Sequence, residues 1–145
     1  MQEQDPMFPS TITRKLYNEK AVLIGTFLGG PLVGAYLIAQ NFKALDESVR
    51  AGRTWLIAIG VFLLAIGLGF IPGLEKIPAV AYSFAFCTAA HSLTKKYQGS
   101  RIALHQTAGG QLYSTGRAAL IGVLGCVIMI AAFYGLIYLA SQDVK

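Results

Sequence analysis

The sequence predicts an all-α, polytopic membrane protein with four transmembrane helices arranged as two hairpins. Hydrophobic residues make up 54% of the 145 residues and charged residues only 13%, whereas roughly 25% of an average soluble domain is charged. Windows without any Lys, Arg, Asp or Glu cover residues 21–40, 54–74, 77–94 and 118–142. A helix needs about 20 apolar residues to cross a bilayer, and about 17 at the least. We therefore predict spans at about 20–41, 54–72, 77–94 and 118–140.

These spans form a single transmembrane domain, residues 20–145, after an N-terminal segment, residues 1–19, that is either a tail or an interfacial helix. A secretory signal peptide is the competing interpretation of the first apolar segment. That segment is too long for one, acidic residues precede it, and three further apolar segments follow. Cys87 and Cys126 fall inside predicted spans, which favours small buried residues over a disulfide framework.

The first span contains the stretch GTFLGGPLVGAY, in which small residues recur four apart. Gly25 with Gly29, and Gly30 with Gly34, are pairs of the kind that lets membrane helices approach closely. Pro31 removes one hydrogen bond from the helical ladder and bends the helix. We expect a central, bent helix whose glycines are packing residues. The alternative is that the break lines a cavity or binding site, as broken helices do in transporters.

The second span opens with Trp55, and the third contains Cys87 and His91 on one helix face. Four residues is a spacing that metal ligands use, but two ligands do not make a zinc site. No Asp or Glu lies within a predicted span to complete one, and intramembrane acids usually mark a proton or ion path. We predict no metal and no cofactor, and the missing acids also argue against a proton-coupled transporter.

The stretch 95–117 is predicted as a basic loop before the fourth span. It holds Lys95, Lys96, Arg101 and Arg117 and no acidic residue, so it carries most of the net charge of +5. These four residues are the candidate contacts for anionic lipids or for an acidic partner. The alternative is positive charge that only sets the orientation, without a specific ligand.

Glycines divide this loop into shorter pieces. Residues 101–108 fit one short amphipathic helix, with Ser100 as its N-cap and Gly109 as its end. The sequence STG at 114–116 then turns the chain into the last span.

The distribution of charge predicts the orientation. The two long loops hold more Lys and Arg than the chain ends do, so the loops should be cytoplasmic and both termini outside. Arg53 and Arg117 each stand at the N-terminal end of a predicted span, where the helix dipole disfavours a cation. Control of topology, or contact with lipid phosphate, is the natural reason for their position.

Two stretches resemble segments of small, uncharacterised bacterial integral membrane proteins. FLGGPLVGAYLIAQNFKAL, residues 27–45, is similar to their Gly-Gly-Pro-Leu helix that continues through Tyr-Leu into Asn-Phe-Lys-x-Leu. GGQLYSTGRAALIG, residues 109–122, is similar to their entry into a final span. The resemblance implies a multi-pass protein of the bacterial inner membrane. It implies no activity, and no catalytic residue can be transferred from it.

No catalytic motif accompanies these segments. The sequence has no Gly-x-Ser-x-Gly, no His-Glu-x-x-His and no phosphate-binding loop, and its basic residues are too few to indicate nucleic-acid binding. The leading hypothesis is therefore a non-enzymatic accessory, scaffold or immunity-type membrane subunit, acting through intramembrane packing as a homo-oligomer or with another subunit.

Two other functions stay open. The first is a small oligomeric channel or carrier for a small solute, with Thr26, Tyr36, Gln40 and Asn41 lining its path. The second is an enzyme that uses His105, Arg101 and Tyr113 at the cytoplasmic interface.

Overall fold

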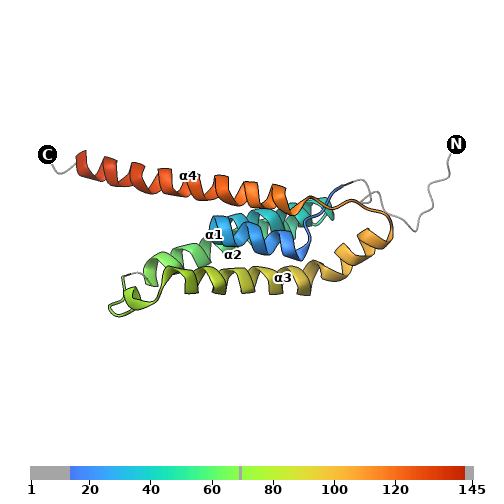
Figure 1. Ribbon diagram of the computed structural model, residues 1–145, viewed down its shortest axis with the longest axis horizontal. Coiled ribbons are helices and arrows are strands. Elements are labelled where there is room, and N and C mark those ends of the chain that lie inside the picture. The colour runs from blue at the N-terminus through green and yellow to red at the C-terminus, as the bar shows by residue number, and fades with distance from the viewer. Residues whose placement is uncertain (1–13, 69, 143–145) are drawn as a thin grey trace.

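The computed structural model describes residues 14–68 and 70–142, and their architecture is all-α (Figure 1). The elements are α1 (Glu19–Ala44), α2 (Ser48–Leu68), the 3₁₀ turn η2 (Leu74–Lys76), α3 (Ala79–Thr107) and α4 (Thr115–Gln142). Among the described residues, the only β-type pairing outside helices is an isolated bridge between Leu16 and Leu112. The predicted all-α class is confirmed.

By length and composition, α1, α2 and α4 are apolar enough to cross a membrane. The third predicted span belongs to α3, which is not in this group among the described residues. The uncharged part of α3, residues 79–94, is only about 24 Å long at 1.5 Å per residue. Its remaining turns carry Lys95, Lys96 and Arg101.

The α1 helix is broken at Gly30, whose backbone has φ 75° and ψ −171°. This region of backbone space is open essentially to glycine alone. Pro31 is then the first residue of a second half-helix, where a missing N–H costs nothing and the fixed φ of proline suits the helix. The Gly-Gly-Pro sequence therefore separates two half-helices, residues 19–29 and 31–44.

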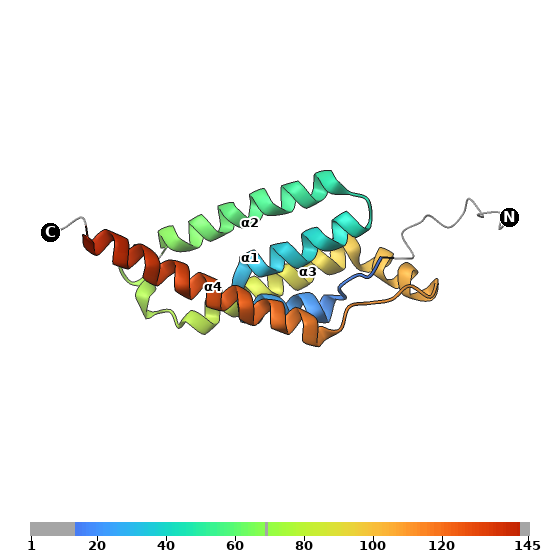
Figure 2. The same cartoon turned by 90° about the horizontal axis from the view of Figure 1, so that it is seen from above.

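The two halves of α1 run back along each other, which corrects the expectation of one bent crossing. Leu37 packs on Gly25, and Thr26 packs on Gly34. In a continuous helix Gly25 and Leu37 would be about 18 Å apart. Figures 1 and 2 show the halves lying antiparallel, and both ends of α1 are at the same end of the molecule.

This hairpin is the centre of the fold, as predicted for the first span. The helices α2, α3 and α4 each pack extensively on α1 and make few contacts with one another. The core is made largely by α1, with Tyr17 before it and single small residues such as Ala51, Ala90 and Ala118 from the other helices. Nearly all of α4 beyond Gly122 is exposed.

The charges gather at one end of the molecule, which we call the basic end. The α1 hairpin begins and ends there, α2 runs away from it, α3 returns to it and α4 runs away again (Figure 1). Lys76 alone among the described Lys and Arg residues lies at the opposite end. Residue 14 and residue 142 therefore lie at opposite ends, which differs from the expectation of termini on a shared side; residues 1–13 and 143–145 lie outside the described residues.

The stretch predicted as a basic loop is mostly helix. Neither Gly99 nor Ser100 interrupts α3, so no separate helix begins at residue 101. Gln98 is anchored by a hydrogen bond from its Nε2 to the Ile38 carbonyl, 3.0 Å, and Gly99 lies close to the Glu19 side chain. This tertiary packing outweighs the weak helix propensity of glycine. Gly109 does follow the helix end, with a φ of 82°.

Candidate functional site

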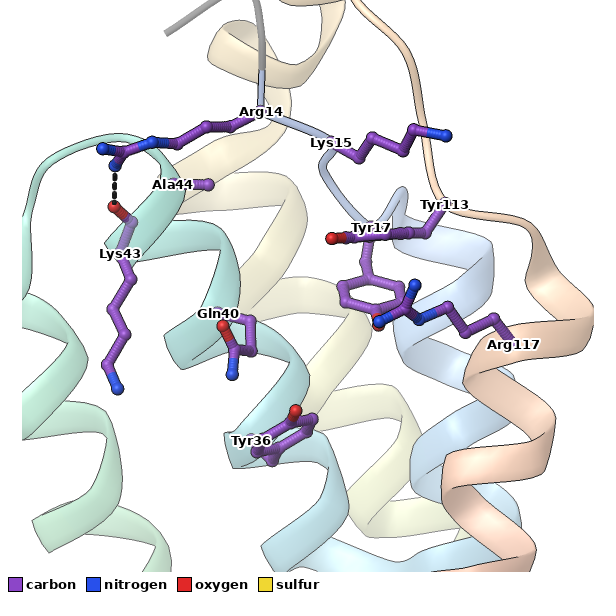
Figure 3. A pocket seen from close by; sticks show the side chains of 9 residues that line it. All are labelled: Arg14, Lys15, Tyr17, Tyr36, Gln40, Lys43, Ala44, Tyr113 and Arg117. Atoms are coloured by element: carbon purple, nitrogen blue, oxygen red, sulfur yellow. Dashed lines mark hydrogen bonds between the residues drawn. The ribbon is translucent and has the colours of Figure 1, made fainter.

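A basic pocket of about 600 Å³ opens at the basic end, between α1, α4 and the chain that precedes α1 (Figure 3). Its four cationic residues are Arg14, Lys15, Lys43 and Arg117. Three tyrosines line it as well, Tyr17, Tyr36 and Tyr113, together with Gln40 and Ala44. No acidic residue is among these lining residues.

The segment before α1 is held in place by backbone pairing. The Tyr113 N–H donates to the Leu16 carbonyl at 2.8 Å, and the Leu16 N–H donates to the Gln111 carbonyl at 3.4 Å. Leu16 is 1% exposed. This pairing places Arg14 and Lys15 beside the entry to α4, which carries Arg117.

A buried polar cluster fixes the same segment to the hairpin. The Asn41 side chain accepts from the Tyr17 N–H at 2.7 Å and donates to the Tyr17 carbonyl at 2.8 Å. It also donates to Gln98 Oε1 at 2.9 Å. All three residues are nearly inaccessible to solvent. Because unpaired buried polar groups are costly, this cluster holds the Tyr17 wall of the pocket in one conformation.

Aromatic rings form the wall next to α4. The rings of Tyr17 and Tyr113 are stacked with centroids 4.5 Å apart, and the Arg117 guanidinium lies 4.2 Å from the Tyr113 ring centroid. Burial raises the pKa of the Tyr17 phenol, and the adjacent Arg117 offsets part of that effect. The Tyr17 hydroxyl therefore keeps its proton at neutral pH and is available as a hydrogen-bond donor.

The positive charge of the pocket is only partly compensated. Arg14 donates to the Asp46 carboxylate at 2.8 Å and to the Lys43 carbonyl at 3.1 Å. Within the described residues, neither Lys15, Lys43 nor Arg117 has an ion pair with an acidic side chain. Cations that line a recess without acidic neighbours concentrate positive potential there. Its chemistry suits an anion that accepts several charge-assisted hydrogen bonds.

The predicted lipid-contact residues are divided by the fold. Arg117 lies in the basic pocket, whereas Lys95, Lys96 and Arg101 are outside it on exposed positions of α3. The Lys96 ammonium lies 5.6 Å from the Tyr97 ring centroid, and Arg101 forms an ion pair with Glu47. The four residues do not form one site.

Most of the pocket was not anticipated from the sequence. The residues missed altogether are Arg14, Lys15, Tyr17 and Lys43. Tyr36 and Gln40 were candidates only for a solute path, and Tyr113 only for an enzyme. Within residues 1–20, acidic residues equal the basic ones in number, so net charge gives no signal there. A usable signal is the presence of cations on both flanks of the first apolar segment, at Lys15 and Lys43, because a hairpin brings its two flanks together.

The predicted packing glycines have different roles. A Cβ on Gly25 would lie 3.2 Å from the Ala118 carbonyl oxygen, and one on Gly29 would lie 2.8 Å from the Gly122 carbonyl oxygen. These two glycines therefore admit the backbone of α4.

Gly34 packs within the hairpin on Thr26. At Gly30 nothing lies within 4 Å of the position of a Cβ, so its importance is conformational and not a matter of packing. Pro31 also has a conformational role, because it is the first residue of the second half-helix.

The remaining candidate groups do not assemble. Among the described residues, no three His, Cys, Asp or Glu side chains gather as metal ligands. Within the described ranges, the buried Nδ1 of His91 has no hydrogen-bond partner. His105 lies 3.1 Å from the Gln111 carbonyl oxygen and packs on Gly110, whereas Arg101 pairs with Glu47.

The sequence matches no protein-family model, and comparison with curated proteins and with solved structures found no match. The geometry described above is therefore the basis for assigning a function.

Proposed function

We propose that this chain is a non-enzymatic accessory subunit of the bacterial cytoplasmic membrane, and that its basic pocket holds an anionic, phosphate-bearing group at the cytoplasmic surface. The observation that carries the proposal is that Arg14, Lys15, Lys43 and Arg117 all line one recess, among whose lining residues there is no acidic side chain.

The proposed orientation follows from the basic end. Positive residues near membrane helices remain on the cytoplasmic side, and all described Lys and Arg except Lys76 lie at this end. In this arrangement α2 and α4 cross the bilayer, and α3, with 29 residues, is long enough to cross as well with its charged turns at the cytoplasmic surface. The α1 hairpin enters from the cytoplasmic side and returns to it, because its halves are only about 16 Å and 21 Å long against a hydrocarbon core of about 30 Å.

The donors of the pocket suit phosphate. Arginine and lysine supply charge-assisted hydrogen bonds to phosphate oxygens. Tyr17, on the side of α4, and Tyr36 and Gln40, on the second half of α1, add neutral donors (Figure 3). A lipid headgroup and a soluble phosphate compound share this chemistry. Basic pockets between helices on the cytoplasmic side are typical sites for anionic headgroups.

Thermal unfolding of the detergent-purified full chain tests the proposal. One arm adds sodium phosphate against sodium chloride at equal ionic strength, and the other adds phosphatidylglycerol against phosphatidylcholine in mixed micelles. A ligand at 100 times its Kd stabilises the folded state by about 2.7 kcal/mol. We expect Tm to rise in at least one arm. A higher Tm with phosphate indicates a soluble ligand, and a higher Tm with phosphatidylglycerol alone indicates a lipid headgroup.

Matched variants locate the effect. Arg117→Gln and Lys15→Gln should abolish the stabilisation by phosphate and lower that by phosphatidylglycerol, whereas Lys95→Gln, an exposed cation outside the pocket, should preserve both. No stabilisation in either arm, or equal losses in all three variants, would overturn the assignment.

The accessory role rests on the large apolar surface that the chain leaves uncovered. Leu56 and Ile57 of α2 and Ile128 of α4 are each more than 60% exposed. Such surfaces face lipid or another subunit. Native mass spectrometry of the protein extracted gently from its membrane should show a stoichiometric complex with a second membrane protein; a bare monomer would contradict the accessory role.

A small oligomeric channel or carrier is the second candidate, and the hairpin tip favours it. The turn at Gly30 and Pro31 lies part-way along α3 and α4 and is only partly covered (Figures 1 and 2). Irregular backbone at membrane depth needs cover from protein or from a water-filled cavity.

Cysteine labelling tests this candidate. In a background with Cys87 and Cys126 replaced by serine, a conduit predicts that cysteines at Leu32 and Tyr36 both react with a membrane-impermeant thiol reagent. Labelling at Tyr36 alone would contradict the conduit, since Tyr36 already opens into the basic pocket.

A further inference from the structure

A second recess lies on another face of the hairpin, and it has a different chemistry. This lateral groove of about 410 Å³ runs between the second half of α1, α2 and α3, and it shares no lining residue with the basic pocket. Its walls are mainly apolar and include Ile38, Ile57, Phe86 and Leu93. Small residues, among them Gly34, Ala58 and Ala89, leave room between the three helices.

The only cations that line the groove stand at one end of it. Arg50 and Arg53 belong to the first two turns of α2, at the basic end. Below Arg53 the same face of α2 continues with Ile57 and Val61, at intervals of four residues. The groove therefore changes from charged to apolar over about 12 Å along α2, at 1.5 Å per residue.

The two arginines are not equally engaged. Arg50 pairs with Glu47 at 3.1 Å, but Glu47 also pairs with Arg101, so its single negative charge is shared. In the part of the chain that the structure describes, Arg53 has no ion pair with an acidic side chain. A positive charge without an acidic partner beside an apolar recess suits a ligand that joins an anion to a hydrocarbon tail.

We propose that the lateral groove binds an anionic phospholipid of the cytoplasmic leaflet, with its headgroup on Arg53 and Arg50 and one acyl chain between α1, α2 and α3. The inference goes beyond the basic pocket, because it concerns a separate site and stands whether or not that pocket binds phosphate.

Quenching of a single tryptophan by brominated acyl chains tests the groove. Trp55 is the only tryptophan, so Trp55→Phe gives a silent background. Phe86→Trp then reports on the groove, and Phe133→Trp, on the exposed outer part of α4, reports on ordinary lipid contact. The full chain is reconstituted in phosphatidylcholine vesicles with an equal mole fraction of brominated phosphatidylglycerol or brominated phosphatidylcholine.

We expect brominated phosphatidylglycerol to quench the tryptophan at 86 with roughly fivefold higher apparent affinity than brominated phosphatidylcholine. No such preference is expected at position 133. Arg53→Gln should remove most of the preference, whereas Lys96→Gln, which lines neither recess, should leave it intact.

A second pair of variants separates the tail from the headgroup. Ala89→Phe fills the groove at an exposed position and should weaken quenching at 86 by both lipids, whereas Ala103→Phe, at an exposed position of the same helix that lines neither recess, should not. Equal preference at positions 86 and 133, or a preference that survives Arg53→Gln, would overturn the proposal.

Discussion

The side-chain amide of Asn41 pairs with both backbone polar groups of Tyr17, although the two residues are 24 positions apart in the sequence. The two hydrogen bonds are 2.7 Å and 2.8 Å long and hold the open ends of the α1 hairpin together. Gly30 forms the turn at the other end of the hairpin. Because Tyr17 also lines the basic pocket, the closure of the hairpin and the shape of the pocket depend on the same contact.

Replacing Asn41 with leucine should destabilise the fold strongly. The change leaves the buried N–H and carbonyl of Tyr17 and the side-chain carbonyl of Gln98 without their Asn41 partner, at a cost of roughly 1–3 kcal/mol for each unpaired group. We expect a clear fall in Tm of the detergent-purified protein. Gln106→Leu, at an exposed position of α3, is the control. An unchanged Tm for Asn41→Leu would show that the pairing does not stabilise the protein.

Alanine at Gly30 should be destabilising, and alanine at Gly60 should not. The backbone of Gly30 is in a region that side chains avoid, which costs about 1–3 kcal/mol. Gly60 lies in the middle of α2 with open space around it, so alanine there should stabilise the helix by roughly 0.5–1 kcal/mol. Thermal unfolding of the two variants measures both signs, and equal behaviour would argue that α1 does not fold back.

Proline 31 offers a milder version of the same test. Pro31→Ala keeps the helical position and removes only the rigid ring at the start of the second half-helix. We expect a loss below about 1 kcal/mol. A large fall in Tm for Pro31→Ala beside a small one for Gly30→Ala would reverse the assigned roles.

The contact between α1 and α4 can be tested with two glycines of α4. A Cβ on Gly122 would lie 2.8 Å from Leu28 Cβ and 2.9 Å from the Gly25 carbonyl oxygen, so alanine there forces the helices apart. Such overpacking costs typically about 1–3 kcal/mol. Gly135→Ala, further along the same helix in open space, should cause no loss. Comparable losses at both positions would indicate a general effect of glycine on α4.

We expect the free energy of unfolding to decline at high pH as the Tyr17 phenol loses its proton. Burial raises its pKa in the folded state above the ordinary 10.0, so the folded protein holds this proton more tightly than the unfolded chain. The stabilisation is complete below pH 10.0 and is lost as the pH rises through the folded pKa. The Tm difference between wild type and Tyr17→Phe should therefore shrink above that pH. A Tm difference that stays constant with pH would show that the Tyr17 phenol is not the group that titrates.

The sequence was sufficient to predict the all-α class and the central position of the first helix, with a bend at Gly-Gly-Pro. It ended the third helix at residue 94, whereas α3 continues to Thr107. It could not reveal the fold-back, because composition does not separate one bent helix from two half-helices joined by a turn. That distinction depends on the backbone angles of Gly30 and on the contact of Gly25 with Leu37.

The candidate site was largely beyond local reasoning for a related physical reason. Arg14 and Lys43 meet only because the hairpin returns, and Arg117 joins them only because Leu16 pairs with Tyr113. Each of these contacts joins distant parts of the chain. Arg117 was singled out because its place at a helix start is locally unfavourable, a conflict visible in the sequence itself.

The return of α1 to the basic end has a consequence for how the protein enters its membrane. With that end in the cytoplasm, as proposed, residues 14–47 require no translocation across the bilayer. Among the described residues, the polar stretches that must be carried across the bilayer are then the short connection between α2 and α3, in which Glu75 and Lys76 cancel in charge, and the uncharged last turn of α4 with Ser141 and Gln142. Insertion of α2 and α3 as one helical hairpin, with α4 following, leaves α1 to dock from the side on which it was synthesised.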